Sequence, residues 1–149
     1  MKLGELKIIQ HSRAREVLQR AIHHQRLAHA FLLFGPEGSG KEALALAVAQ
    51  TLLCAKRPTA SSSPAADLFG GPAAEPQRDW ACGECSGCKR VAEVAHPDLH
   101  VILPRPASAS EQDRLEVLQS LAAQPFNRSR PWENPFILID DIRELKKNF

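Results

Sequence analysis

The segment with the clearest chemical potential lies between residues 35 and 42. Its first seven positions fit the phosphate-binding pattern G-x-x-x-x-G-K-S/T, known as the P-loop. In that pattern glycines turn backbone N–H groups toward phosphate oxygens, and the lysine neutralises the β- and γ-phosphates. The pattern predicts a nucleotide phosphate site, with ATP and Mg²⁺ as candidate ligands. Its residues are Gly35, Pro36, Glu37, Gly38, Ser39, Gly40, Lys41 and Glu42.

The eighth position departs from the pattern. Glu42 stands where a Ser or Thr hydroxyl normally ligates Mg²⁺. A carboxylate there brings negative charge close to the phosphates, so it either coordinates the metal in an unusual way or weakens nucleotide affinity. The segment therefore predicts nucleotide binding and does not by itself predict hydrolysis. A glycine turn that merely connects a strand to a helix is the alternative interpretation.

The second chemical motif is a set of four cysteines. Cys82, Cys85 and Cys88 follow a C-x2-C-x2-C spacing, and Cys54 is the remaining cysteine that could complete a tetrahedral site. Four thiolates leave no open position for water, so the sequence predicts a structural zinc site. The alternatives are disulfides, free buried cysteines and an iron–sulfur cluster, although a ferredoxin would have its next cysteine close by, followed by proline.

The elements that must position these motifs follow from the apolar pattern. Residues 30–34 form an apolar run that ends at Gly35 and has the length of a strand buried on both faces. Helices are expected on both sides of it, one from Ser12 and one from Lys41 to Cys54. A strand, a glycine loop and a helix form the first half of a βαβ unit, which predicts an α/β fold with a parallel sheet.

The remaining elements are less regular. Two proline-rich segments, 55–80 and 104–136, are expected to be insertions, and the first of them to be flexible. No stop signal follows Phe149, so the chain is expected to continue in a longer protein. The further expected elements are a helix at 89–95, a strand at 99–103, a helix at 110–123 opened by a Ser110–Asp113 capping box, an apolar run at 136–139 and a helix from Asp141.

Charge and hydropathy exclude several classes of protein. Nineteen basic and seventeen acidic side chains leave a formal charge of +2, too small to indicate a dedicated nucleic-acid binder. No run approaches the roughly 20 apolar residues of a membrane span, and the N-terminus lacks the apolar core of a signal peptide. A cytoplasmic protein without a membrane partner is expected, and in that reducing compartment structural disulfides are rare.

Three segments together carry a family resemblance: residues 29–41, the C-x2-C-x2-C run and residues 96–101. In order and spacing they resemble the delta-prime subunits of the bacterial DNA polymerase III clamp loader. The resemblance implies an AAA+ P-loop fold, in which 1–149 is a partial nucleotide-binding domain and 54–88 is an inserted zinc module. It also implies a stator with weak or no ATP hydrolysis, which helps to load the sliding clamp onto primed DNA beside the gamma/tau and delta subunits of the polymerase holoenzyme.

Two other functions stay open at this point. The gamma/tau subunits, which are active ATPases, share the loop and the zinc module, but they typically have Gly-Lys-Thr in the loop and lack the His-Pro-Asp-Leu-His signature of residues 96–100. A zinc-containing P-loop nucleotide kinase would need acceptor-binding arginines and a lid, neither of which can be located in the sequence.

The segment from Phe136 to Asp141 could be mistaken for a Walker B strand, because two aspartates follow its apolar residues. The resemblance instead implies that this segment opens a helix, with Asp140 and Asp141 as cap residues. Walker B, the sensors, the arginine finger and the collar domain would then lie beyond Phe149. No catalytic residue is assigned.

Overall fold

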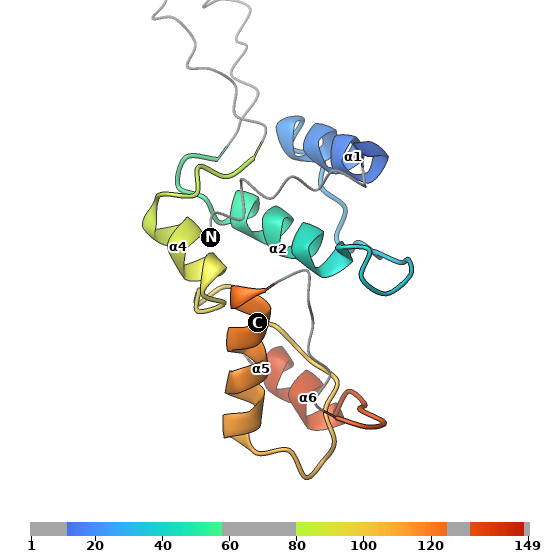
Figure 1. Cartoon of the computed structure of the whole chain (residues 1–149). Coiled ribbons are helices and arrows are strands. Elements are labelled where there is room, and N and C mark those ends of the chain that lie inside the picture. The colour runs from blue at the N-terminus through green and yellow to red at the C-terminus, as the bar shows by residue number, and fades with distance from the viewer. Residues whose placement is uncertain (1–11, 58–79, 125–131, 148–149) are drawn as a thin grey trace, which may run out of the picture.

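The computed structural model describes residues 12–57, 80–124 and 132–147, and the fold is given for these residues (Figure 1). They contain five helices and no strand. The only sheet-like pairing among them is a single antiparallel bridge between Arg105 and Phe136. Most of the predicted insertion 55–80, and residues 125–131 of the second insertion, lie outside the described residues. The helices are α1 (Ser12–His23), α2 (Lys41–Leu52), α4 (Ser86–Ala92), α5 (Glu111–Ala123) and α6 (Ile139–Lys147).

Helix α2 is the centre of the described structure, because it packs against both α1 and α4 (Figure 1). Its sequence is almost entirely Ala and Leu, which are strong helix formers. One side buries Leu44 and Ala47 against Leu18 of α1. Elsewhere on the helix, Leu46 packs against Leu121 of α5. The apolar composition that predicted a buried helix is therefore explained by neighbours on several sides.

The predicted strand at 30–34 is not formed among the described residues. Leu33 packs against the cluster formed by α1 and α2, but Leu32 and Phe34 are 86% and 88% exposed. A strand requires a neighbouring backbone to pair with its N–H and C=O groups, and no described segment provides one here. The second predicted strand, 99–103, is likewise unpaired in this part of the chain, and the predicted parallel sheet is not seen there.

Helix α4 begins three residues earlier than the predicted helix 89–95, for two local reasons. At its start the Cys85 sulfur accepts a hydrogen bond from the Cys88 N–H, so a cysteine acts as the N-cap. At its end Val94 adopts a left-handed φ of 52°, and the Ala95 N–H bonds back to the Arg90 carbonyl at 2.8 Å. Such a turn ends a helix, although it usually contains glycine.

The predicted capping box of α5 is confirmed. The Ser110 N–H donates to Asp113 Oδ2 at 2.8 Å, and the Asp113 N–H donates to Ser110 Oγ at 3.2 Å. Helix α6 begins at Ile139, two residues before the predicted start at Asp141. Among the described helices, none is both long enough and apolar enough to cross a membrane.

Candidate metal centre and glycine loop

The four cysteines, hereafter the four-cysteine site, come together in the structure. Cys54 follows the end of α2, Cys82 and Cys85 lie in the loop before α4, and Cys88 lies in the first turn of α4. All four Sγ atoms lie within 4.8 Å of one another. Three of the Sγ–Sγ distances are 3.6 Å (Cys54–Cys82), 3.8 Å (Cys82–Cys88) and 3.9 Å (Cys85–Cys54).

These distances fit a tetrahedral thiolate site. Four sulfurs, each about 2.3 Å from a zinc ion, form a tetrahedron with edges of about 3.8 Å. The distances are far too long for disulfides, whose S–S bond is about 2.05 Å, and all four cysteines are free thiols. The arrangement is therefore consistent with a structural zinc site.

Backbone N–H groups already face the sulfurs. The Cys82 N–H donates to Cys54 Sγ at 3.5 Å, the Cys85 N–H to Cys82 Sγ at 3.4 Å and the Cys88 N–H to Cys85 Sγ at 3.4 Å. Hydrogen bonds of this kind stabilise the charged form of an acceptor. The loop therefore places N–H donors where thiolates would accept them.

The four thiols differ in how readily they ionise. The N–H of Cys88 lowers the pKa of Cys85 to about 6. Burial opposes ionisation of Cys82, but N–H groups of Glu84 and Cys85 outweigh it, so its pKa is lowered. Burial raises the pKa of both Cys54 and Cys88. A coordinated divalent cation would resolve this conflict, because coordination deprotonates a thiol.

Two polar residues of α2 bind the backbone of the cysteine knuckle, which we define as residues 80–92. The Gln50 side-chain Nε2 donates to the Cys88 carbonyl at 2.9 Å. The Thr51 hydroxyl accepts from the Ala81 N–H at 3.2 Å and donates to the Ala47 carbonyl at 2.7 Å. Sequence reasoning missed both residues. The available signal was two adjacent polar residues inside a helix that is otherwise Ala, Leu and Val.

The knuckle also approaches α2 closely. A Cβ atom added at Gly87 would lie 2.4 Å from the Leu53 carbonyl oxygen, closer than side chains can approach a backbone. Gly83 has a left-handed φ of 73°, as the tight turn between Cys82 and Cys85 requires. The two glycines therefore serve different purposes, one for the turn and one for close packing.

The predicted phosphate-binding residues form a loop at the other end of α2. Gly38 and Gly40 have left-handed φ values of 72° and 80°. Gly40 directly precedes α2 and offers no side chain to cap its first N–H groups. Lys41, the first residue of the helix, donates from Nζ to the Pro36 carbonyl at 3.0 Å. We call residues 35–41 the glycine loop.

Glu42 lies in the first turn of α2. A carboxylate is favourable at that position, because the N-terminal end of a helix carries partial positive charge. The residue thus has a structural reason to be acidic that is independent of Mg²⁺. The same helix end would attract phosphate.

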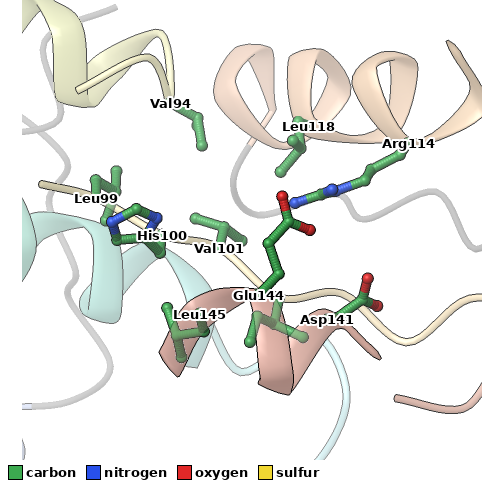
Figure 2. A pocket seen from close by; sticks show the side chains of 10 residues that line it. Val94, Leu99, His100, Val101, Arg114, Leu118, Asp141, Glu144 and Leu145 are labelled. Atoms are coloured by element: carbon green, nitrogen blue, oxygen red, sulfur yellow. The ribbon is translucent and has the colours of Figure 1, made fainter. Parts of the chain in front are cut away.

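A separate cavity of about 210 Å³ lies between α5, α6 and the extended segment 99–102 (Figure 2). Leu99, Val101, Leu118 and Leu145 form apolar walls, and Arg114 and Glu144 lie side by side at one edge. This cavity contains none of the predicted site residues.

Asp140 and Asp141 both lie in the first turn of α6 and are both bound by arginines. Asp141 accepts from Arg105 at 2.8 Å in a largely buried ion pair, and Asp140 accepts from Arg143 at 3.0 Å at the surface. This arrangement agrees with a helix that opens at these residues rather than with a Walker B strand.

Comparison with known proteins gives a consistent result. The family model described as "DNA polymerase III, delta subunit" matches residues 10–69 and 60–149. The DNA polymerase III subunit delta′ of Pseudomonas aeruginosa is 41% identical over 121 residues, which cover 81% of this chain and 30% of that protein. The subunit delta′ of Bacillus subtilis is 36% identical over 92 residues, 62% of this chain and 22% of that protein.

A third relative, the subunit delta′ of Yersinia pestis, is 29% identical over 82 residues, 55% of this chain and 18% of that protein. The chain thus spans less than a third of the length of these relatives. No solved structure matches it. Because the family model covers nearly all of the chain, the chain belongs to the DNA polymerase III delta-prime subunit family.

Proposed function

We propose that this chain is the nucleotide-binding and zinc-binding part of a clamp-loader subunit. In this proposal residues 1–149 are part of an AAA+ domain, residues 54–88 are its zinc module and residues 104–136 are a second insertion. The subunit acts in the cytoplasm with gamma/tau and delta subunits to place the sliding clamp on primed DNA. The observation that carries the proposal is the family match across almost the whole chain.

Zinc is the metal best suited to the four-cysteine site. The Sγ–Sγ distances of 3.6–3.9 Å support it, as do the N–H groups that face the sulfurs. The ion would be held by Cys54, Cys82, Cys85 and Cys88. It would cross-link the end of α2 to the cysteine knuckle and would have no catalytic role, since four protein ligands leave no open coordination position.

The proposed fold gives the exposed apolar segment 30–34 a partner. Within a parallel sheet its N–H and C=O groups would be paired, and Leu32 and Phe34 would be covered by helices on the far face. Support comes from the apolar sequence of the segment and from the exposure of those two side chains. Amide hydrogen exchange of the full-length protein tests this directly, because sheet pairing would protect residues 31–34.

A stator fits the glycine loop better than a motor does. Glu42 replaces the hydroxyl that would ligate Mg²⁺, and Lys41 is engaged by the loop's own Pro36 carbonyl. Nucleotide would therefore have to compete for the lysine and would find no standard Mg²⁺ ligand beside it. Residues 35–42 could still bind a nucleotide without hydrolysing it.

The test uses the full-length protein, alone and mixed with the other clamp-loader subunits. Mg-ATP binding and turnover are measured for the wild type, for Lys41→Ala and for the matched control Lys56→Ala, whose exposed lysine lies outside the loop. We expect assembly in every case and no turnover that depends on Lys41. Turnover by this subunit that Lys41→Ala abolishes would make it a motor, and failure to assemble would reject the clamp-loader role.

A further inference from the structure

We infer that binding of metal at the four-cysteine site orders α2, and that metal binding and phosphate binding are therefore coupled, with Gln50 and Thr51 as the positioning residues. The inference rests on the proposed nucleotide site and adds a mode of regulation to it. It follows from three features of the described residues. The two sites share one helix, side-chain hydrogen bonds join the C-terminal end of that helix to the knuckle, and the glycine loop at its N-terminal end contains an internal hydrogen bond from Lys41.

The shared helix joins the two sites directly. Lys41 is the first residue of α2, and Cys54 lies two residues beyond its last residue, Leu52. Twelve helical residues span about 18 Å, at 1.5 Å per residue. No flexible linker separates either site from α2. A displacement or local unfolding of one end of this short helix therefore affects the site at the other end.

At the C-terminal end, the helix is fastened to the knuckle by side chains rather than by apolar packing alone. Gln50 and Thr51 are 1% and 0% exposed, and their partners are the carbonyl of the ligand Cys88 and the N–H of Ala81, directly before the ligand Cys82. Loosening of the knuckle would leave the Gln50 amide without this partner, and Thr51 would keep only its bond to Ala47 within α2, and the loss of buried hydrogen bonds is costly. The order of α2 therefore depends on the order of the metal site.

Gln50 is especially dependent on the knuckle. Its Oε1 is buried and has no hydrogen-bond partner in the described structure, so the bond from Nε2 to Cys88 is the only one its side chain makes there. A side chain with one unpaired atom contributes little net stability by itself. The bond is accordingly better explained as a positional link between α2 and the metal ligand than as a source of stability.

At the N-terminal end, the loop is closed on itself. The bond from Lys41 Nζ to the Pro36 carbonyl must break before the ammonium can reach a phosphate, and the first turn of α2 must hold its N–H groups in place. That turn is anchored by the buried Ala43 and Leu44, and Trp80 of the knuckle packs against the cluster that contains Leu44. Each ligand thus orders a helix that the other also needs, which predicts positive coupling.

Coupling of this kind must be reciprocal. In the full-length protein, zinc affinity is measured by competition with a chromophoric chelator, with and without saturating Mg-ATP. Mg-ATP affinity is measured with and without zinc. We expect each ligand to tighten the other by the same factor, about 5-fold or more. Equal affinities in all conditions would overturn the inference.

Two shape-preserving variants locate the link. Gln50→Leu and Thr51→Val remove the polar atoms while nearly conserving volume, and we expect both to bind one zinc per chain while the coupling factor falls toward one. Gln119→Leu, at an exposed position of α5, is the matched control and should keep the wild-type factor. Wild-type coupling in both link variants would overturn the role of these residues.

A second readout separates this inference from the proposed function. Amide hydrogen exchange in the first turns of α2, residues 43–47, needs no nucleotide. We expect this exchange to accelerate when zinc is removed from the wild-type protein. We also expect it to be faster in zinc-bound Gln50→Leu and Thr51→Val than in the zinc-bound wild type. Either result supports the link even if Mg-ATP does not bind. Absence of Mg-ATP binding would reject the nucleotide site alone, whereas unchanged exchange in every sample would reject the link.

Discussion

In the region of α1, α2 and α4 the stabilising contacts are buried, whereas around α5 and α6 they are mostly polar and close to the surface. The first region contains the buried residues Ile22, Leu44, Gln50, Thr51 and Cys88. In the second, only Val117 and Leu121 are buried, and α6 has no buried residue. The two regions should therefore respond differently to loss of metal, to mutation and to acid.

The difference shows how a small unit can be made rigid. A core of few buried residues rarely suffices by itself, and a metal cross-link such as the proposed zinc would compensate for it. The four-cysteine site lies next to the most deeply buried part of the described chain. The α5 and α6 region has instead one largely buried ion pair and one capping box, each of which acts locally.

Loss of the metal should have the largest effect and should divide the two regions. Structural zinc in small modules binds with about 10–16 kcal/mol, so Cys88→Ser or chelation should destabilise α2 and α4 by several kcal/mol. Amide exchange should accelerate there and change little in α5 and α6. Metal analysis of the wild type should give one zinc per chain.

The exposed neighbour Ser86 provides the control, since Ser86→Ala should retain zinc and stability. Equal loss of protection in both regions would mean that they unfold as one unit. Iron in place of zinc would reject the zinc assignment.

The ion pair of Arg105 with Asp141 should be the next most sensitive point, and its loss should affect only the second region. The side chains are 16% and 9% exposed, and Asp141→Asn leaves the guanidinium without its anion. Hydrogen bonds to charged groups contribute about 1.5–3 kcal/mol, so α6 should lose that much local stability, as measured by amide exchange.

Asp140→Asn is the matched control, because Asp140 is 82% exposed in its pair with Arg143. Exposed pairs contribute about 0–1 kcal/mol. Similar effects of the two variants would contradict the distinction between a buried and a surface pair.

Gly87→Ala should strain the first region without removing any ligand. The new Cβ would meet the Leu53 carbonyl, and overpacking of this kind costs about 1–3 kcal/mol. Thermal unfolding of the zinc-bound protein should show the loss, while metal analysis still finds one zinc. Lys89→Ala, exposed on the same helix, should change little. A neutral Gly87→Ala would mean that α4 can move away from α2 freely.

The capping box of α5 should give the smallest effect. Ser110→Ala removes an N-cap that is worth about 1 kcal/mol, while Ser108→Ala, at an exposed non-capping position, should be silent. The Ser110 hydroxyl, and then its N–H, lower the pKa of Asp113 below the ordinary 3.8.

The pH dependence of this cap follows from that direction. Stabilisation by Asp113 is complete above the ordinary value and is lost as the pH falls through the lowered one. Acid titration followed by NMR should therefore loosen the start of α5 only below the ordinary Asp range. Loosening near neutral pH would contradict the capping role.

The sequence predicted the four-cysteine site well, because ligand spacing is local information. Three cysteines in a C-x2-C-x2-C run must lie close together in any fold, and only Cys54 had to be brought from elsewhere. The capping box and the helix after the glycine loop were predicted for the same reason. In each case the determining residues lie within a few positions of one another.

Features that depend on distant partners could not be derived from the local sequence. The strand at 30–34 needs a neighbouring backbone that the described residues do not supply, so its pairing stays a prediction. Gln50 and Thr51 looked like interruptions of an apolar helix, since their partners, Cys88 and Ala81, are about thirty residues or more away along the chain. The early start of α4 required knowing that a cysteine sulfur would act as its cap.

The position of the four cysteines also bears on how the protein is made. All of them lie between residues 54 and 88, so the ligand set is complete once that stretch has left the ribosome. At about 5–20 residues per second, the residues that follow Cys88 take further seconds to be added. We expect metal capture to fix α2 during that interval, while the side chains of Leu32 and Phe34, which no described residue covers, are still exposed to solvent.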